Sequence, residues 1–142
     1  MRNVLLPFDG SAPAKRAIEY LVGVAAEYPN ILVHVINVQS EPKLYGNYVS
    51  ANMLEQLHGG ALDHAREVIV EAGAMLREAG VRHEEHAVVG EVIGELAHAV
   101  KSLGCDTVIM GTRGMSNLGN LFMGSVATRV VHEVPVPVLL VK

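Results

Sequence analysis

The sequence predicts an α/β fold: a single-domain, open, five-stranded parallel sheet with helices on both faces. Short apolar runs alternate with longer segments of helical periodicity, in the order βαβαβαβαβ. Half of the 142 residues are hydrophobic and only 4% are aromatic, so the core must be aliphatic, as parallel sheets covered by helices require. With no repeat and no internal boundary, residues 1–142 are expected to form one domain.

Two strands and one helix are predicted in the first part of the chain. The apolar run over residues 3–8 predicts the first strand, which ends in a Pro-Phe-Asp-Gly turn. Ser11 can cap the next helix, and Pro13 falls in its opening turn, where a missing N–H costs nothing. Apolar residues at helical spacing carry this helix to Pro29, and the β-branched run over residues 31–38 predicts a central strand.

The sequence pattern predicts the elements after residue 38 with uneven clarity. Residues 39–60 carry a weak pattern, and the Gly59-Gly60 pair suggests a loop with a broken helical start. Glycines at positions 80 and 104 stand where helix C-caps are expected. The expected elements are a helix over 61–79, a strand over 81–89, a helix over 91–103, a strand over 106–110, a helix over 126–133 and a last strand from Val134 to Val141.

Composition excludes several classes of function. The net charge is −4 and no basic run occurs, which argues against nucleic-acid binding by phosphate neutralisation. Cys105 is the only cysteine, so neither an intrachain disulfide nor a cysteine zinc cluster can form. No apolar run is long enough to span a bilayer, and the N-terminal apolar stretch is too short for a signal peptide. We therefore expect a cytoplasmic protein without membrane insertion.

A glycine-rich segment joins the fourth predicted strand to the last predicted helix. Its spacing is Gly111, two residues, Gly114, nine residues and Gly124-Ser125. Glycine can take positive φ and turn backbone N–H groups toward a ligand, and the first turn of a helix favours an anion. Ser125 would add a hydroxyl donor. The spacing predicts a site for a nucleotide or another phosphate-bearing ligand, with a long structural turn as the alternative.

Asp9 follows the first strand, at the sheet edge where ligands of such folds bind. If the first and fourth strands are neighbours, Asp9 and the segment that begins at Gly111 flank one cleft. The alternative is that Asp9 only forms the turn before Ser11.

With these residues in place, the chain resembles the universal stress proteins of the ATP-binding type. The resemblance covers essentially the whole chain and rests on several segments. These are the Leu-Leu-Pro-Phe-Asp opening, His34-Val35-Ile36, the run from Asp106 to Gly111, the G-x2-G-x9-G-[S/T] motif and the Pro-Val-Pro-Val-Leu-Leu-Val ending. It implies a Rossmann-like fold, similar to adenine nucleotide alpha hydrolases, with strand order 3-2-1-4-5. It also implies a homodimer built through the C-terminal strand, acting as a stress-response sensor or regulator with an unidentified protein partner.

The resemblance also implies a bound ATP or AMP, with Mg²⁺ or Mn²⁺ held through the phosphates. By this resemblance Asp9 and the main chain of Val35 contact the adenine, and Gly111 lies at the ribose. The residues that hold the phosphates are Gly114, Asn117, Gly124, Ser125 and the amide of Val126. The full implied nucleotide-binding set is Pro7, Asp9, Val35, Met110, Gly111, Gly114, Asn117, Gly124, Ser125 and Val126.

Two other functions stay open. The segment from Gly119 to Ser125 reads as a P-loop without its lysine, and the sequence names no catalytic base beside Asp9, so catalytic residues are not expected. The alternatives to a nucleotide-binding regulator are therefore a slow ATP hydrolase and a dimeric scaffold with a vestigial nucleotide site. Arg113 or Arg129 could supply positive charge, or could simply face solvent.

The seven histidines predict no protein-bound metal. His83 and His86 lie three apart on a predicted strand and so point to opposite faces. His34 interrupts an apolar strand and is interpreted as a core or interface residue. The segment from Val134 to Val141 contains Pro135 and Pro137, which predicts an edge strand covered either by a second copy of the chain or by a helix or loop of its own.

Overall fold

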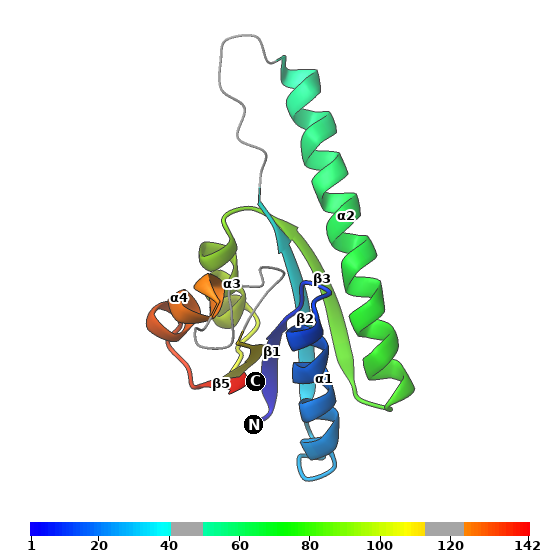
Figure 1. The fold of residues 1–142 in the computed structure, drawn as a ribbon, viewed down its shortest axis with the longest axis vertical. Coiled ribbons are helices and arrows are strands. Elements are labelled where there is room, and N and C mark those ends of the chain that lie inside the picture. Colours follow the sequence, from blue (N-terminus) through cyan, green and yellow to red (C-terminus); the bar gives the residue numbers. More distant parts are fainter. Residues whose placement is uncertain (41–49, 113–123) are drawn as a thin grey trace.

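The fold is a five-stranded sheet between two layers of helices, shown in Figure 1. The computed structural model describes residues 1–40, 50–112 and 124–142. Its elements in chain order are β1 (Asn3–Pro7), α1 (Ala12–Ala25), β2 (Leu32–Gln39), α2 (Ala51–Glu78), β3 (His83–Val89), α3 (Val92–Ser102), β4 (Thr107–Gly111), α4 (Ser125–Glu133) and β5 (Val138–Val141).

The sheet has the order β3-β2-β1-β4-β5 with all pairs parallel, as expected. The chain reverses its direction of strand addition between β1 and β4, which are neighbours. Pro7 pairs with Ile36 of β2, and β4 runs alongside β1, so the carboxyl ends of these three strands meet at one edge. Ligands of open α/β sheets bind at such a switch point.

Two apolar clusters cover the two faces of the sheet. Helices α1 and α2 pack on one face, around buried residues such as Leu6, Val35 and Leu76. Helices α3 and α4 pack on the other face, around residues such as Leu5, Ile36 and Ile93. Alternate residues of β1 and β2 supply both clusters, which explains why these central strands read as continuous apolar runs.

Turn and cap residues match the expectations at most helix ends. Ser11 caps α1 and accepts a hydrogen bond from the Ala14 amide at 3.3 Å. Gly80 and Gly104 follow α2 and α3 with φ of +71° and +65°. Only glycine takes this conformation without steric cost, so both helices end where the sequence indicated.

The expected break at Gly59-Gly60 is wrong. Helix α2 begins at Ala51 and passes through both glycines, so it extends well beyond the sheet at its N-terminal end (Figure 1). Ser50 caps it by accepting from the Met53 amide at 3.2 Å. An interior glycine costs only about 1 kcal/mol relative to alanine, so the capped helix continues through the pair to the part of α2 that packs on the sheet, from Ala65 to Leu76.

The last strand is shorter than expected. β5 begins at Val138, after both prolines, and forms the edge of the sheet beside β4. Proline has no N–H for a strand ladder, and Pro137 contributes only its carbonyl, which accepts from the Val108 amide at 2.9 Å. Of the helices in the described ranges, none has the length and hydropathy needed to cross a membrane.

Candidate functional site

A cavity of about 400 Å³ opens at the carboxyl ends of the central strands. Its wall comes from the carboxyl ends of β1, β2 and β4, the residues that follow β1 and β4, and the N-terminal turns of α1, α3 and α4. The described wall residues are Pro7, Phe8, Asp9, Ala14, Ile36, Asn37, Val38, Val92, Leu96, Met110, Gly111, Thr112, Gly124, Ser125, Val126 and Ala127.

Most of the residues singled out from the sequence meet at this cavity. Those on its wall are Pro7, Asp9, Met110, Gly111, Gly124, Ser125 and Val126. Val35 is absent from the described wall and is fully buried in the core beneath α1 and α2. Gly114 and Asn117 lie outside the residues that the structure describes, as does Arg113.

The turn after β1 fixes Asp9 at the cavity. Gly10 takes φ of +82°, and the Asp9 carboxylate accepts a hydrogen bond from the Ser11 amide at 2.9 Å. Asp9 thus forms the turn and also contributes to the cavity wall, which joins the two roles that the sequence left as alternatives. Its carboxylate is exposed and retains acceptor capacity for a ligand.

The N-terminus of α4 contributes backbone donors to the same wall. Gly124 precedes this helix, and no side chain in the described ranges caps it, whereas side chains of Ser11, Ser50 and Glu91 cap the other helices. The first amides of a helix have no partner within it. Ser125, Val126 and Ala127 therefore present first-turn N–H groups beside the cavity, with the positive end of the helix dipole.

Positive φ is not the reason for glycine at position 124. Gly124 has φ of −60° and ψ of 155°, which other residues adopt readily. The described glycines with positive φ are Gly10, Gly80 and Gly104. The expectation that the motif glycines supply left-handed backbone is therefore wrong for Gly124, and Gly111 also lies outside that conformation.

The end of β2 supplies a part of the wall that sequence reasoning missed. Asn37 is buried, donates from Nδ2 to the Phe8 carbonyl at 2.8 Å, and accepts from Gln39 Nε2 at 2.7 Å. Asn37 thereby ties the segment after β1 to the end of β2. An amide side chain at the end of a β-branched run was a usable signal, because parallel strands present their carboxyl ends at one edge.

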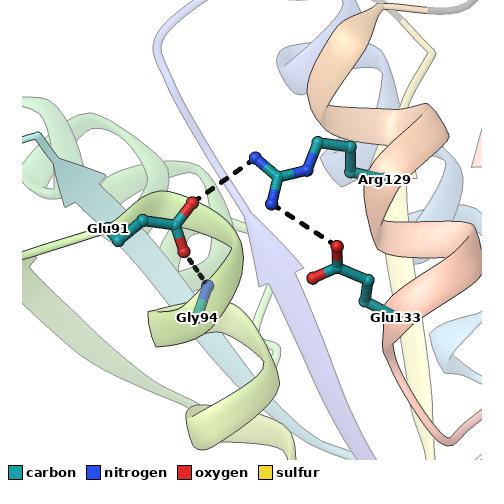
Figure 2. Close-up of polar contacts among 4 residues, drawn as sticks. All are labelled: Glu91, Gly94, Arg129 and Glu133. Atoms are coloured by element: carbon teal, nitrogen blue, oxygen red, sulfur yellow. Dashed lines mark hydrogen bonds and ion pairs between the residues drawn. The ribbon is translucent and has the colours of Figure 1, made fainter.

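An ion-pair network joins the two helices beside the cavity (Figure 2). Arg129 of α4 contacts Glu91 at 3.5 Å and Glu133 at 3.4 Å, while the second oxygen of Glu91 accepts the Gly94 amide at the start of α3. This amide, opposed by slight desolvation and aided by Arg129, lowers the pKa of Glu91. The charge of Arg129 is thus compensated by two exposed carboxylates, which favours the solvent-facing alternative for this residue.

The structure also brings together His34, Glu84 and His86, on neighbouring strands. Sequence spacing placed His83 and His86 on opposite faces but gave no cross-strand partner for either. His34 is buried, as expected, and this burial, together with His86, lowers its pKa while Glu84 opposes the effect. One nitrogen from each of the two histidines and one oxygen of Glu84 form a cluster that could hold a metal ion. The histidine spacing within one strand did not indicate this grouping.

Comparison with known proteins gives consistent matches over the whole chain. A protein of Thermus aquaticus, "Universal stress protein in QAH/OAS sulfhydrylase 3'region", is 33% identical over 99% of this chain and 98% of its own length. The solved structure of the hypothetical protein MJ0577 of Methanocaldococcus jannaschii covers 99% of this chain and 95% of its own, with a TM-score of 0.82 and 24% identity.

Two further solved structures with the same fold contain adenine nucleotides. One is a universal stress protein in complex with cAMP, at TM-score 0.70 and 22% identity over 99% of this chain and 96% of its own. The other is an Arabidopsis thaliana member with AMP bound, at TM-score 0.68 and 19% identity over 100% of this chain and 91% of its own. The model of the universal stress protein family matches residues 1–142. The chain therefore belongs to the universal stress protein family.

Proposed function

We propose that this protein binds an adenine nucleotide, ATP or AMP, in the cavity at the carboxyl ends of β1, β2 and β4. The observation that carries the proposal is the N-terminus of α4, which has no side-chain cap among the described residues and lines this cavity. Such a terminus favours a phosphate group through both its free amides and its dipole. That two structural relatives contain AMP and cAMP supports the choice of an adenine nucleotide.

The cavity wall offers groups that suit both parts of a nucleotide. The backbone amides of Ser125 and Val126 would bind the phosphates, since no lysine is among the described wall residues. Apolar side chains such as Val38, Val92 and Leu96 line another part of the wall and offer a surface for the base. Asp9 would accept from the base, with Gly111 at the ribose. Mg²⁺ or Mn²⁺ would be held through the phosphates and not by protein ligands.

We propose a binding role and not an enzymatic one. Asp9 is the one ionisable side chain among the described wall residues, and its carboxylate already accepts the Ser11 amide. A general base for hydrolysis would need a partner that orients it or shifts its pKa. A slow hydrolase remains the rival, and product formation by the wild-type chain above that of a Ser125→Val variant would favour it.

The regulatory part of the proposal concerns assembly. β5 lies at an edge of the sheet and carries half-buried apolar residues from Val138 to Val141. An apolar strand edge invites pairing, so we propose that two copies dimerise through the C-terminal segment from Val134 to Val141. Nucleotide occupancy would then change a surface of this cytoplasmic dimer that a protein partner recognises. A dimeric scaffold with a vestigial nucleotide site remains the other rival.

Calorimetric titration of the nucleotide-free chain with ATP and with AMP, in the presence of Mg²⁺, tests the proposal. The decisive variants are Gly124→Asp and Gly124→Asn, because both side chains cap a helix about equally well. Only aspartate adds a negative charge where a phosphate would bind. We expect Gly124→Asp to weaken ATP binding at least about tenfold more than Gly124→Asn does, a difference of about 1.4 kcal/mol.

Thermal melting of each variant controls for folding, since the wild-type φ and ψ at position 124 suit either replacement. Equal affinities for ATP in the two variants would show that no phosphate lies at the α4 N-terminus. A folded wild-type chain that binds neither nucleotide would favour the scaffold.

A further inference from the structure

The face of the sheet covered by α3 and α4 carries a histidine–glutamate cluster outside the cavity. In the parallel register His34 of β2 pairs with Glu84 of β3, and Ile36 pairs with His86. Glu84 and His86 are two residues apart on one strand and therefore point to the same face as His34. Ile36 belongs to the core beneath α3 and α4, which identifies that face. None of the three clustered residues is among the described wall residues of the cavity.

We propose that His34, Glu84 and His86 form a binding site for a divalent transition metal ion of the Zn²⁺ type. The three ligand atoms are His34 Nδ1, His86 Nε2 and one Glu84 carboxylate oxygen. All of them lie within 4.8 Å of one another. The proposal is independent of the nucleotide site, because the two sites share no described residue.

The separations of the ligand atoms suit tetrahedral coordination. The two histidine nitrogens are 3.0 Å apart, and the glutamate oxygen lies 3.4 Å from His34 Nδ1 and 3.8 Å from His86 Nε2. Zinc–ligand bonds of 2.0–2.2 Å at tetrahedral angles place neighbouring ligand atoms about 3.3 Å apart. An ion can therefore enter with shifts of a few tenths of an ångström, which side-chain rotation about χ2 and χ3 can supply.

The donor set selects the class of metal. Two imidazole nitrogens and a carboxylate oxygen suit Zn²⁺ and other late first-row ions, whereas Mg²⁺ and Ca²⁺ prefer oxygen ligands alone. Three protein ligands leave a fourth position for water, as in zinc sites that are open to solvent. Without a metal, one ring must donate its N–H to the other ring across the 3.0 Å contact. A metal ion would replace that shared proton and bind both lone pairs.

The site is both rigid and accessible. The side chains of His34, His86 and Glu84 are 5%, 25% and 57% exposed, so the cluster runs from the core to solvent at the edge strand β3. β2 and β3 pair continuously from Val33 to Gln39, which fixes the spacing of the three residues. Because His34 is already held in place by the sheet, little side-chain entropy is lost when it binds a metal. The exposed carboxylate of Glu84 can contact an ion that arrives from solvent.

The test uses the full chain without a histidine tag, treated with chelator and free of nucleotide. We expect calorimetry with Zn²⁺ to give one site per chain, and Co²⁺ to give the strong visible absorption of tetrahedral coordination. His86→Ala and Glu84→Gln should each weaken Zn²⁺ at least about tenfold, because loss of even an outer-shell partner costs that much. His83→Ala is the matched control, since His83 is on the same strand but turns its Nδ1 to the Val81 carbonyl at 2.9 Å.

Both variants remove groups that are partly exposed, so folding should survive, and thermal melting in chelator checks this. Equal Zn²⁺ affinity in the wild type, His86→Ala and Glu84→Gln would overturn the proposal, because any binding would then come from other surface groups. No Zn²⁺ binding by the wild-type chain would overturn it as well. Retention of the Zn²⁺ site in His83→Ala, together with its loss in the other two variants, would support it.

Discussion

Gly111 and Pro13 lie in such close contact that any side chain at position 111 would force the backbone to shift. A Cβ built on Gly111 would lie 2.7 Å from both the carbonyl carbon and the carbonyl oxygen of Pro13. The end of β4 therefore passes directly against the first turn of α1. Both residues neighbour the cavity, since Gly111 and the adjacent Ala14 line its wall. The glycine of the sequence motif is thus required by the packing of the fold itself.

Gly111→Ala should destabilise the chain by about 1–3 kcal/mol, as overpacking against backbone does. The clashing atoms belong to the main chain at a helix start and cannot turn aside. Chemical denaturation measures the change in the free energy of unfolding. The control is Gly23→Ala in α1, where a Cβ meets nothing within 4 Å and should stabilise the helix by about 0.5–1 kcal/mol. Equal effects of the two substitutions would contradict the close contact.

The glycine pair within α2 gives a second prediction. A Cβ at Gly59 or at Gly60 meets nothing within 4 Å, and both residues lie inside the helix. Gly59→Ala and Gly60→Ala should each raise the free energy of unfolding by up to about 1 kcal/mol, since alanine is the better helix former. Circular dichroism and thermal melting would check the gain. A loss of helical signal would show that the chain needs a break at this place.

The limits of sequence reasoning follow from these same residues. Alternating apolar runs predicted the strands, and the serine and glycine positions predicted most helix caps, because both depend on local patterns. The order of the strands came from the family resemblance and not from these patterns. The glycine pair at positions 59 and 60 misled, because glycine inside a helix carries only a modest penalty and the Ser50 cap starts α2 well before the pair. The contacts of Asn37 with Phe8, and of His34 with His86, depend on the register between strands far apart in sequence. Periodicity within one strand carries no information on that register.

The N-terminus of the chain is tied to β4 by Asp106, which gives a pH-dependent prediction. The Asp106 carboxylate accepts the amides of Arg2 at 2.8 Å and Asn3 at 3.0 Å, and the Thr107 hydroxyl at 2.8 Å. Slight burial alone would raise the pKa of Asp106, but these hydrogen bonds together lower it. The carboxylate therefore binds protons less readily in the folded state than in the unfolded state.

The stabilisation by Asp106 is present above the unfolded pKa, near pH 4, and is lost as the pH falls through the lower folded pKa. Asp106→Asn should lower the free energy of unfolding at pH 7 by about 1 kcal/mol and flatten its decline in acid. Denaturation curves from pH 7 down to the acid limit of folding measure both effects. Asp63→Asn, on the exposed face of α2, is the control. An unchanged acid dependence in Asp106→Asn would contradict the role of these hydrogen bonds.

Cys105 offers a prediction about reactivity. It is buried just before β4, in the cluster beneath α3 and α4, and burial, with the neighbouring Asp106 charge, raises its pKa to about 11. The thiolate is the reactive form, so the native chain at pH 8 should react with a disulfide reagent at least about a hundredfold more slowly than the unfolded chain. Since Cys105 is the only cysteine, the released chromophore reports on it alone. Rapid stoichiometric labelling of the native chain would show that the connection between α3 and β4 opens readily to solvent, and would place Cys105 outside the stable core.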